Sequence, residues 1–234
     1  MHRGLTNPLG TVRVITSLVT KAENLGLKVR YSSDFEELVD LRLKVRGDRV
    51  SPMFDPAACQ LDDQRAFWVG AFDHAGNPHS LQAFRLDLVH PNLAEWAVGW
   101  MTGLYVKRHE LVMPSVIEPP PHSRSRTLKG ALVYHGEMWI DRTVRKREYF
   151  DTLPKIGMLI AHIKWQPDAL WALTGNMFAT HGYITRSGYA LQEHGFLQWH
   201  PDWKPIGADE SEWLIIAERS HLEYLAATEA AEVV

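Results

Sequence analysis

Basic side chains gather in one short stretch of the chain, where they could bind an anion. The run Arg142-Thr-Val-Arg145-Lys146-Arg147 places four cationic side chains within six residues. Guanidinium and ammonium groups form charge-assisted hydrogen bonds to phosphate or carboxylate. Arg85 ends an apolar stretch, where its planar fork suits a substrate carboxylate. A solvated surface run and a surface arginine are the ordinary alternatives, and the sequence leaves both open.

A second polar feature is Asn176, which follows the apolar run 170–173. Its side chain can accept from unpaired N–H groups of a first helical turn, so we expect a helix over about 176–186. The spacing of small and apolar residues supports one buried face on this helix. Gly188 suits a left-handed residue just past the helix end. The members of the expected face are Phe178, Ala179, Gly182 and Tyr183.

Histidine is frequent, with twelve residues, yet the spacing gives no metal motif. No pair stands as His-x-x-x-His or His-Glu-x-x-His, and the lone Cys59 cannot complete a Cys/His set. We therefore expect no metal. Cys59 is interpreted as a small packing side chain rather than a nucleophile. His135 could shuttle a proton, but a lone histidine in a turn is usually incidental.

Composition favours a protein with a packed core and argues against several classes of partner. Hydrophobic residues make up 45%, and the formal net charge of −3 argues against a dedicated nucleic-acid binder. No apolar run approaches the roughly 18 residues of a membrane span, and the N-terminal stretch does not resemble a signal peptide. A single cysteine rules out an intrachain disulfide. These features predict a cytoplasmic protein without membrane or nucleic-acid partners.

The chain must position these residues with alternating strands and helices. Residues 1–26 are interpreted as an N-terminal arm, and 27–234 as a single domain. Prolines and a basic tip interrupt the rhythm at about 90–128, which we interpret as an insertion over one end of the sheet. The order of elements predicts an α/β fold in which a mixed, mostly antiparallel sheet carries helices on both faces. The expected strands cover 27–31, 66–72, 80–86, 131–134, 137–141, 170–173, 189–193 and 212–217, and the expected helices 35–45, 151–163, 176–186 and 222–234.

The segment from Asn176 to Tyr189 resembles the Asn-x-x-Ala-x-x-x-Tyr…Gly-aromatic helix of the GCN5-related N-acetyltransferases. The resemblance covers most of the chain from about Leu27 to Ala217. It implies the acyl-CoA N-acyltransferase fold, in which the strand before the long helix splays from its neighbour. The pantetheine arm of the donor lies in that gap. The family's glycine-rich phosphate loop corresponds here to 142–147, where basic side chains stand in place of glycines.

The same resemblance implies roles for individual residues. Glu137 would deprotonate the acceptor amine, and Tyr183 would protonate the departing thiolate. Arg85 would bind the substrate. The acyl donor would be acetyl-CoA or a longer acyl-CoA, and the acceptor a small-molecule amine. The donor-binding residues would be Trp139, Ile140, Arg142, Arg145, Lys146, Arg147 and Asn176.

Several segments also resemble the acyl-homoserine-lactone (autoinducer) synthases. These are Leu41 to Arg46, Leu61-Asp-Asp followed by 66–69, Phe84-Arg-Leu, and Gly136 to Arg142. This resemblance implies an alternative, an acyl-carrier-dependent synthase of an acylated amino acid or homoserine lactone, with acyl carrier protein as partner. The missing glycines favour a third alternative, a non-catalytic acyl-CoA-binding or interaction module. Homodimerisation stays open.

Overall fold

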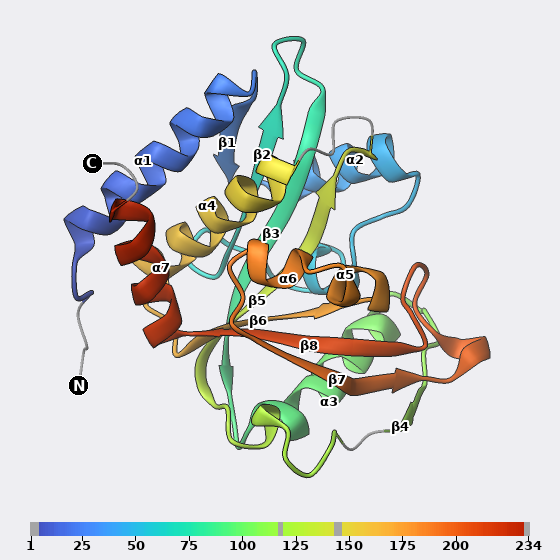
Figure 1. Cartoon of the computed structure of the whole chain (residues 1–234). Coiled ribbons are helices and arrows are strands. Elements are labelled where there is room, and N and C mark those ends of the chain that lie inside the picture. The colour runs from blue at the N-terminus through green and yellow to red at the C-terminus, as the bar shows by residue number, and fades with distance from the viewer. Residues whose placement is uncertain (1–4, 117–118, 143–146, 232–234) are drawn as a thin grey trace.

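The computed structural model describes residues 5–116, 119–142 and 147–231. In this part of the chain eight strands form one sheet in the order β1-β2-β3-β5-β6-β8-β7-β4, with β5 and β6 as its parallel pair (Figure 1). The mixed, mostly antiparallel sheet predicted from the sequence is therefore confirmed. The strands are β1 (Lys28–Ser32), β2 (Ala66–Phe72), β3 (Pro78–Val89), β4 (Pro114–Val116), β5 (Gly130–Ile140), β6 (Ala169–Thr174), β7 (Leu191–Trp199) and β8 (Ser211–Glu218).

The sheet carries a hydrophobic core on each face because its central strands are buried on both sides. Every residue of β2 is buried, and its consecutive residues Phe67 and Trp68 enter different cores. Strand β8 divides in the same way, with Leu214 in one core and Ile215 in the other. Successive side chains of a strand point to opposite faces, so a continuous apolar run supplies both cores.

One face, called the α4 face, is covered by α1 (Pro8–Asn24), α4 (Arg147–Trp165) and α7 (Arg219–Ala231) (Figure 1). Residues 8–24, within the predicted N-terminal arm, form a 17-residue helix. Asn7 caps it by accepting from the backbone N–H of Gly10, and Val14, Leu18 and Ala22 are buried at intervals of four. Among the described residues, no helix is both long and apolar enough to cross a membrane.

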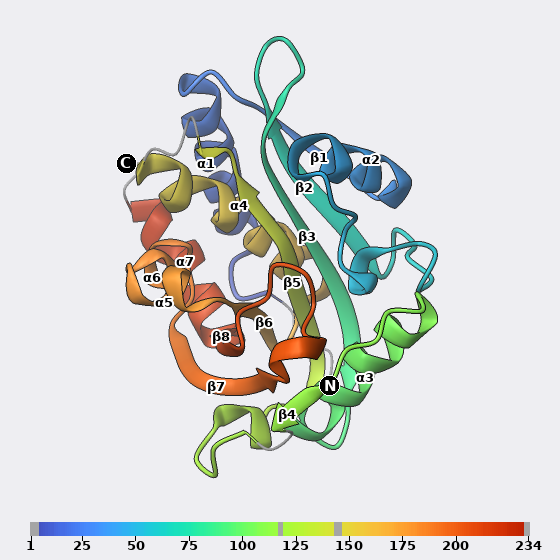
Figure 2. The same ribbon diagram turned by 90° about the vertical axis from the view of Figure 1, so that its right-hand side faces the viewer.

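The opposite face, called the α2 face, is covered by α2 (Phe35–Arg46) and α3 (Leu93–Lys107) (Figure 2). Asp34 caps α2 by accepting from Glu37 N. The insertion predicted at 90–128 contains α3 and the edge strand β4, which pairs with β7. Short 3₁₀ turns lie at η1 (Pro52–Phe54), η2 (Arg124–Arg126) and η4 (Pro201–Trp203).

Strands β5 and β6 pair only at their start. The pairing runs from Leu132 with Ala169 to Tyr134 with Trp171, whereas β5 continues to Ile140. The two strands predicted at 131–134 and 137–141 are therefore one strand, interrupted by a bulge against β3. Such a bulge leaves an extra residue and bends the strand.

The bulge lies at Glu137 and Met138, opposite Gln82, and directly follows Gly136. A Cβ atom at Gly136 would lie 2.6 Å from the Phe54 ring, so only glycine lets the two approach. Glu137 has a φ of +56°, a left-handed conformation that side chains other than glycine seldom adopt. Residues held in such a conformation cluster at functional sites.

The helix expected over 176–186 is two short helices, α5 (Asn176–Thr180) and α6 (Tyr183–Arg186). Gly182, in the left-handed region at φ +73°, separates them. Gly188 has the predicted positive φ, +98°. The capping role predicted for Asn176 is wrong. Gly175 holds the cap position without a side-chain bond, and the Asn176 N–H donates to Asp209 Oδ2 at 2.6 Å.

Candidate functional site

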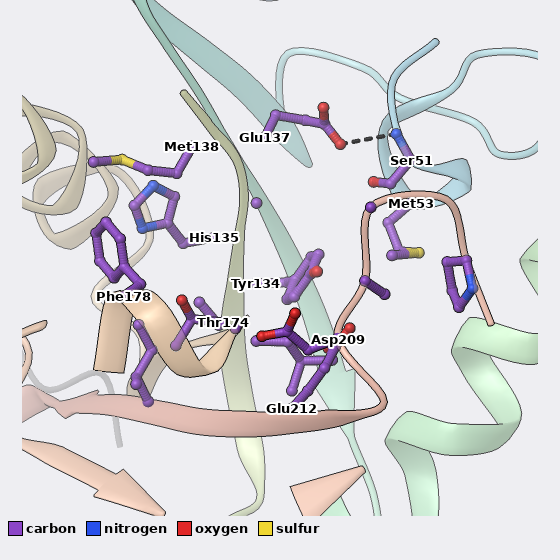
Figure 3. A pocket seen from close by; sticks show the side chains of 18 of the residues that line it. Ser51, Met53, Tyr134, His135, Glu137, Met138, Thr174, Phe178, Asp209 and Glu212 are labelled. Carbon is purple, nitrogen blue, oxygen red and sulfur yellow. Dashed lines mark hydrogen bonds between the residues drawn. The ribbon is translucent and has the colours of Figure 1, made fainter. Parts of the chain in front are cut away.

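A cavity of about 440 Å³ lies where β5 and β6 separate, and residues of both cores line it (Figure 3). It therefore passes between the two strands from one face of the sheet to the other. Its walls on the α2 face include Met53, Met101, Tyr105, Tyr134, Trp199 and Glu212. Its walls on the α4 face include His135, Met138, Ala172, Phe178, Ser187 and Tyr189.

Glu137 lines the cavity, as the sequence interpretation requires, but its carboxylate is held by protein groups. The bulge turns the side chain toward α2, where Oε2 forms an ion pair with Arg42. Oε1 accepts from Ser51 N at 2.8 Å (Figure 3). Arg42 also donates to Asp48 at 2.9 Å. Both oxygens of Glu137 are thus engaged, and its side chain is 4% exposed.

Glu212 is a second carboxyl at the cavity, which the sequence reasoning missed. On β8, residues 214 and 216 enter the core of the α2 face, and Glu212 continues that stripe. Trp199 Nε1 donates to Glu212 Oε1 at 3.2 Å. Burial raises the pKa of Glu212 to about 7, opposed by the Trp199 hydrogen bond and reinforced by the charge of Asp209. The available signal was the alternation itself, with a glutamate at a core-facing position.

The phenols of Tyr105 and Tyr134 face the same carboxyl. Burial raises the pKa of both, and the charge of Glu212 is the next largest cause in each. Within the described ranges, no lysine or arginine forms an ion pair with Glu212. Glu212 therefore lies beside aromatic side chains and, among the described residues, has no cation paired with it.

On the α4 face, His135 and Tyr189 form a buried neutral pair. The His135 Nδ1 atom and the Tyr189 hydroxyl lie 2.6 Å apart, and the imidazole stacks on Phe84 at 4.3 Å between ring centroids. Burial lowers the pKa of His135 to about 3, so its ring is neutral at physiological pH. In the described part of the chain, His135 Nε2 and Ser187 Oγ are buried and have no hydrogen-bond partner. His135 is therefore a cavity residue in the middle of β5 and not an incidental residue of a turn.

Tyr183 lies outside the cavity. It stacks on Phe150 at 4.5 Å and packs against Phe178 at 5.3 Å. The structure therefore does not bring it together with Glu137. The turn at Gly182 redirects the chain, and Tyr189 is the tyrosine of this segment that lines the cavity.

Arg85 is unavailable to a substrate carboxylate. Its side chain is buried, forms an ion pair with Asp87 at 3.0 Å, and donates to the Met53 carbonyl at 3.0 Å. Its guanidinium carbon lies 5.1 Å from the centroid of the Trp100 ring. These contacts correct the substrate-binding role predicted for Arg85. The residue instead ties β3 to η1 and α3.

The predicted donor-binding residues are dispersed. Trp139 and Ile140 follow the bulge and pack into opposite cores, away from the cavity wall. Asn176 and Arg142 are exposed. The side chain of Arg147, at the start of α4, and the residues Arg145 and Lys146 lie outside what is described, so the predicted phosphate role of this run stays a prediction.

Cys59 and the histidines offer no metal chemistry in the described residues. No group of three or more His, Cys, Asp or Glu side chains lies close enough to hold an ion there. Cys59 is partly buried, with its sulfur 3.4 Å from three carbonyl oxygens of the η1 region. Burial raises the pKa of its thiol, which makes it a poor nucleophile.

Comparisons with known proteins give a likeness of structure without a likeness of sequence. No family model and no curated protein matches the chain. Three similar solved structures are NAA60 of Arabidopsis thaliana with acetyl-CoA, a variant of the spermidine N-acetyltransferase SpeG of Vibrio cholerae, and FeeM, an N-acyl amino acid synthase from uncultured soil microbes.

The three are 15%, 11% and 10% identical to this chain, with TM-scores of 0.45, 0.47 and 0.44. They cover 82%, 88% and 86% of it, and 98%, 99% and 97% of their own chains. Identities this low carry nothing about substrate or activity.

The fold itself is identified by the chain's own topology. A mostly antiparallel sheet has one described parallel pair, and that pair separates beside a bulge ahead of the long helix α4. A strand that separates from its neighbour ahead of the long helix is the feature that the resemblance to the GCN5-related N-acetyltransferases implied. The chain has the acyl-CoA N-acyltransferase fold of that superfamily.

Proposed function

We propose that this protein transfers an acyl group from a thioester donor to an amine. The observation that carries the proposal is the free edge of β5 beside the cavity. From His135 to Met138, the stretch of β5 that lines the cavity, no described strand pairs with β5 on its β6 side. Backbone N–H and C=O groups on such an edge accept an extended, amide-bearing ligand as they would accept a strand.

The passage through the sheet supports a two-substrate reaction. A donor lying on the α4 face and an acceptor entering from the α2 face meet where β5 and β6 part. The bulge at Glu137 and Met138 lies at this point and interrupts the ladder with β3. N–H groups aimed at the thioester oxygen there would stabilise the negative charge that develops on it.

The α4-face arm of the cavity suits the acyl chain and its polar linkage. Met138, Ala172 and Phe178 give it an apolar wall. His135 Nε2 and Ser187 Oγ supply two buried polar atoms that lack protein partners in the described residues. Buried polar groups are ordinarily hydrogen-bonded, which makes a polar atom of the bound donor a fitting partner.

The donor is an acyl-CoA in this proposal, and a carrier-protein thioester is the alternative. Arg142 follows β5, and α4 begins at Arg147, so a basic side chain and a helix N-terminus lie together at the end of the donor strand. A helix N-terminus favours phosphate. An open cavity also argues for catalysis over the non-catalytic alternative.

Thermal unfolding with acetyl-CoA, octanoyl-CoA and free coenzyme A tests the donor proposal. Ligand at a hundredfold excess over its dissociation constant stabilises the native state by about 2.7 kcal/mol. Thr174→Trp, at the cavity wall on β6, should abolish the shift, whereas Leu191→Trp, at an exposed position on β7, should retain it. Equal shifts in both variants would place donor binding elsewhere. A wild-type shift with acylated carrier protein alone would favour the alternative donor.

A further inference from the structure

We propose that Glu212 is the general base of this reaction and selects cationic primary amines as acceptors. The inference rests on the proposed acyl transfer and names the acceptor class of that same site. It also replaces Glu137 in the role that the sequence suggested for it.

The geometry brings one carboxyl to the acceptor side without a protein cation. Glu212 extends the core-facing stripe of β8 into the cavity on the α2 face. Its recorded hydrogen bond comes from a neutral donor, the Trp199 indole. The titratable and charged groups that line this side from the neighbouring elements are Tyr105 on α3, Tyr134 and Glu137 on β5, Asp209 in the loop before β8, and Arg42 and Arg46 on α2.

The cations among these groups are directed to other carboxylates. Arg42 pairs with Glu137 and Asp48. The Arg46 guanidinium lies 3.8 Å from Asp48 and is 37% exposed. Asp209 accepts from Asn176 N. Like Glu212, Asp209 has no cation among its described partners, but it is exposed, whereas Glu212 is partly buried. Glu212 is therefore the shielded cavity carboxyl on this side that an incoming cation can neutralise.

The surroundings of Glu212 suit an ammonium group. A partly buried carboxylate without a counter-ion discriminates for a positive ligand and against neutral or anionic ones. Tyr105, Tyr134 and Trp199 present aromatic rings around it, and an ammonium ion over such a face gains further attraction. An acceptor that enters as R–NH₃⁺ thus meets attractive groups before it reaches the donor.

The same surroundings tune Glu212 for proton transfer. Burial raises its pKa to about 7, close to the operating pH at which a general base is most effective. Glu137, by contrast, has each oxygen occupied by Arg42 or by Ser51 N. It holds α2 and η1 against the bulge rather than accepting a proton.

The reaction balances with Glu212 as proton acceptor. Its carboxylate takes one proton from R–NH₃⁺, and the amine lone pair forms a C–N bond to the thioester carbonyl carbon. The C–S bond then breaks, and its electron pair leaves on sulfur. The second proton lost by nitrogen ends on the thiolate to give the thiol. Glu212 returns its own proton to solvent, so the products are an amide, a thiol and H⁺.

The test compares Glu212→Gln with Glu210→Gln, an exposed glutamate outside the cavity wall in the loop leading into β8. Thiol release is followed from pH 5 to 9 with acetyl-CoA and a primary alkylamine. Wild type and Glu210→Gln should show a rate that rises through an apparent pKa near 7. Glu212→Gln should lose that limb and fall on the order of 100-fold or more in kcat. Donor-induced thermal shifts should be the same in all three proteins.

An acceptor that needs no base separates catalysis from structure. An alkoxyamine is neutral at pH 7, so Glu212→Gln should lose far less activity with it than with the alkylamine. Equal losses with both acceptors, or a retained pH limb, would overturn the role of Glu212 and leave acyl transfer standing. A lower KM for the neutral alkoxyamine than for an alkylamine of the same size would overturn the acceptor class. No thiol release by wild type with any amine would overturn the proposed function and this inference together.

Discussion

Glu137 and Glu212 line the same cavity, yet their surroundings differ in kind. Glu137 meets a guanidinium and a backbone N–H, which satisfy both its oxygens. Glu212 meets an indole N–H and aromatic rings, with no cation among its described partners. The contrast teaches that a carboxylate on the expected strand is not thereby the reactive one. The partners that each group already has decide which of the two remains available to a substrate.

The first prediction concerns the removal of Arg42, the ion-pair partner of Glu137. Arg42→Ala leaves a buried carboxylate without its cation, which should cost about 3–5 kcal/mol of folding stability. The measurement is denaturant unfolding monitored by tryptophan fluorescence. Arg46→Ala, on the same helix with a half-exposed guanidinium, should cost under about 1 kcal/mol.

A double variant decides whether the loss at Arg42 comes from the stranded charge. Arg42→Met combined with Glu137→Gln removes both charges and should recover much of the stability. Equal destabilisation by the single and the double variant would mean that packing, rather than the ion pair, holds α2 to the bulge.

The second prediction concerns Glu212, whose surroundings disfavour its charged form, whereas Arg42 stabilises the charged form of Glu137. The pKa of this carboxyl rises from 4.5 to about 7 on folding. The contribution of its protonated form to folding stability is therefore complete below pH 4.5 and is lost as the pH rises through 7. Glu212→Gln removes this loss. The free energy of unfolding of this variant, relative to that of wild type, should increase by at most about 3 kcal/mol between pH 4.5 and 8.

Paired urea titrations of wild type and Glu212→Gln at several pH values measure this difference. A constant offset at every pH would show that Glu212 titrates alike in the folded and unfolded chains, contrary to its burial. Glu210→Gln should track wild type throughout because its side chain is exposed.

The third prediction contrasts the tyrosine that the sequence suggested with the one that the cavity uses. Tyr189→Phe removes the hydroxyl that pairs with His135 and should cost about 1–3 kcal/mol. Tyr183→Phe, outside the cavity and partly exposed, should change stability by less than about 0.5 kcal/mol. A larger loss at Tyr183 would contradict the assignment of the two residues.

Local pattern was sufficient for most of the fold. The apolar run at 66–72 and the helical pattern over 35–45 predicted β2 and α2 nearly to the residue. The helix α1 was underestimated, although Asn7-Pro8 and the spacing of Val14 and Leu18 are signals for it in the sequence.

Partners were beyond local pattern. Arg42 and Glu137 lie 95 residues apart, and the sequence around either residue does not predict their contact. Arg85 was predicted to bind a substrate because the sequence did not reveal that its strand is buried. Its ion-pair partner Asp87 lies on the same buried strand. Tyr183 was displaced by the turn at Gly182, a residue that is visible in the sequence but was assigned to a continuous helix.

The most direct test of the account is amide formation that depends on the gap between β5 and β6. The purified protein is incubated with acetyl-CoA or octanoyl-CoA and a primary alkylamine, and thiol release is measured together with the mass of the product. The account predicts one amide per thiol released, with both lost in Thr174→Trp and both retained in Leu191→Trp. Amide formation at an equal rate in the two variants would contradict it, because acyl transfer would then not occur where the strands part.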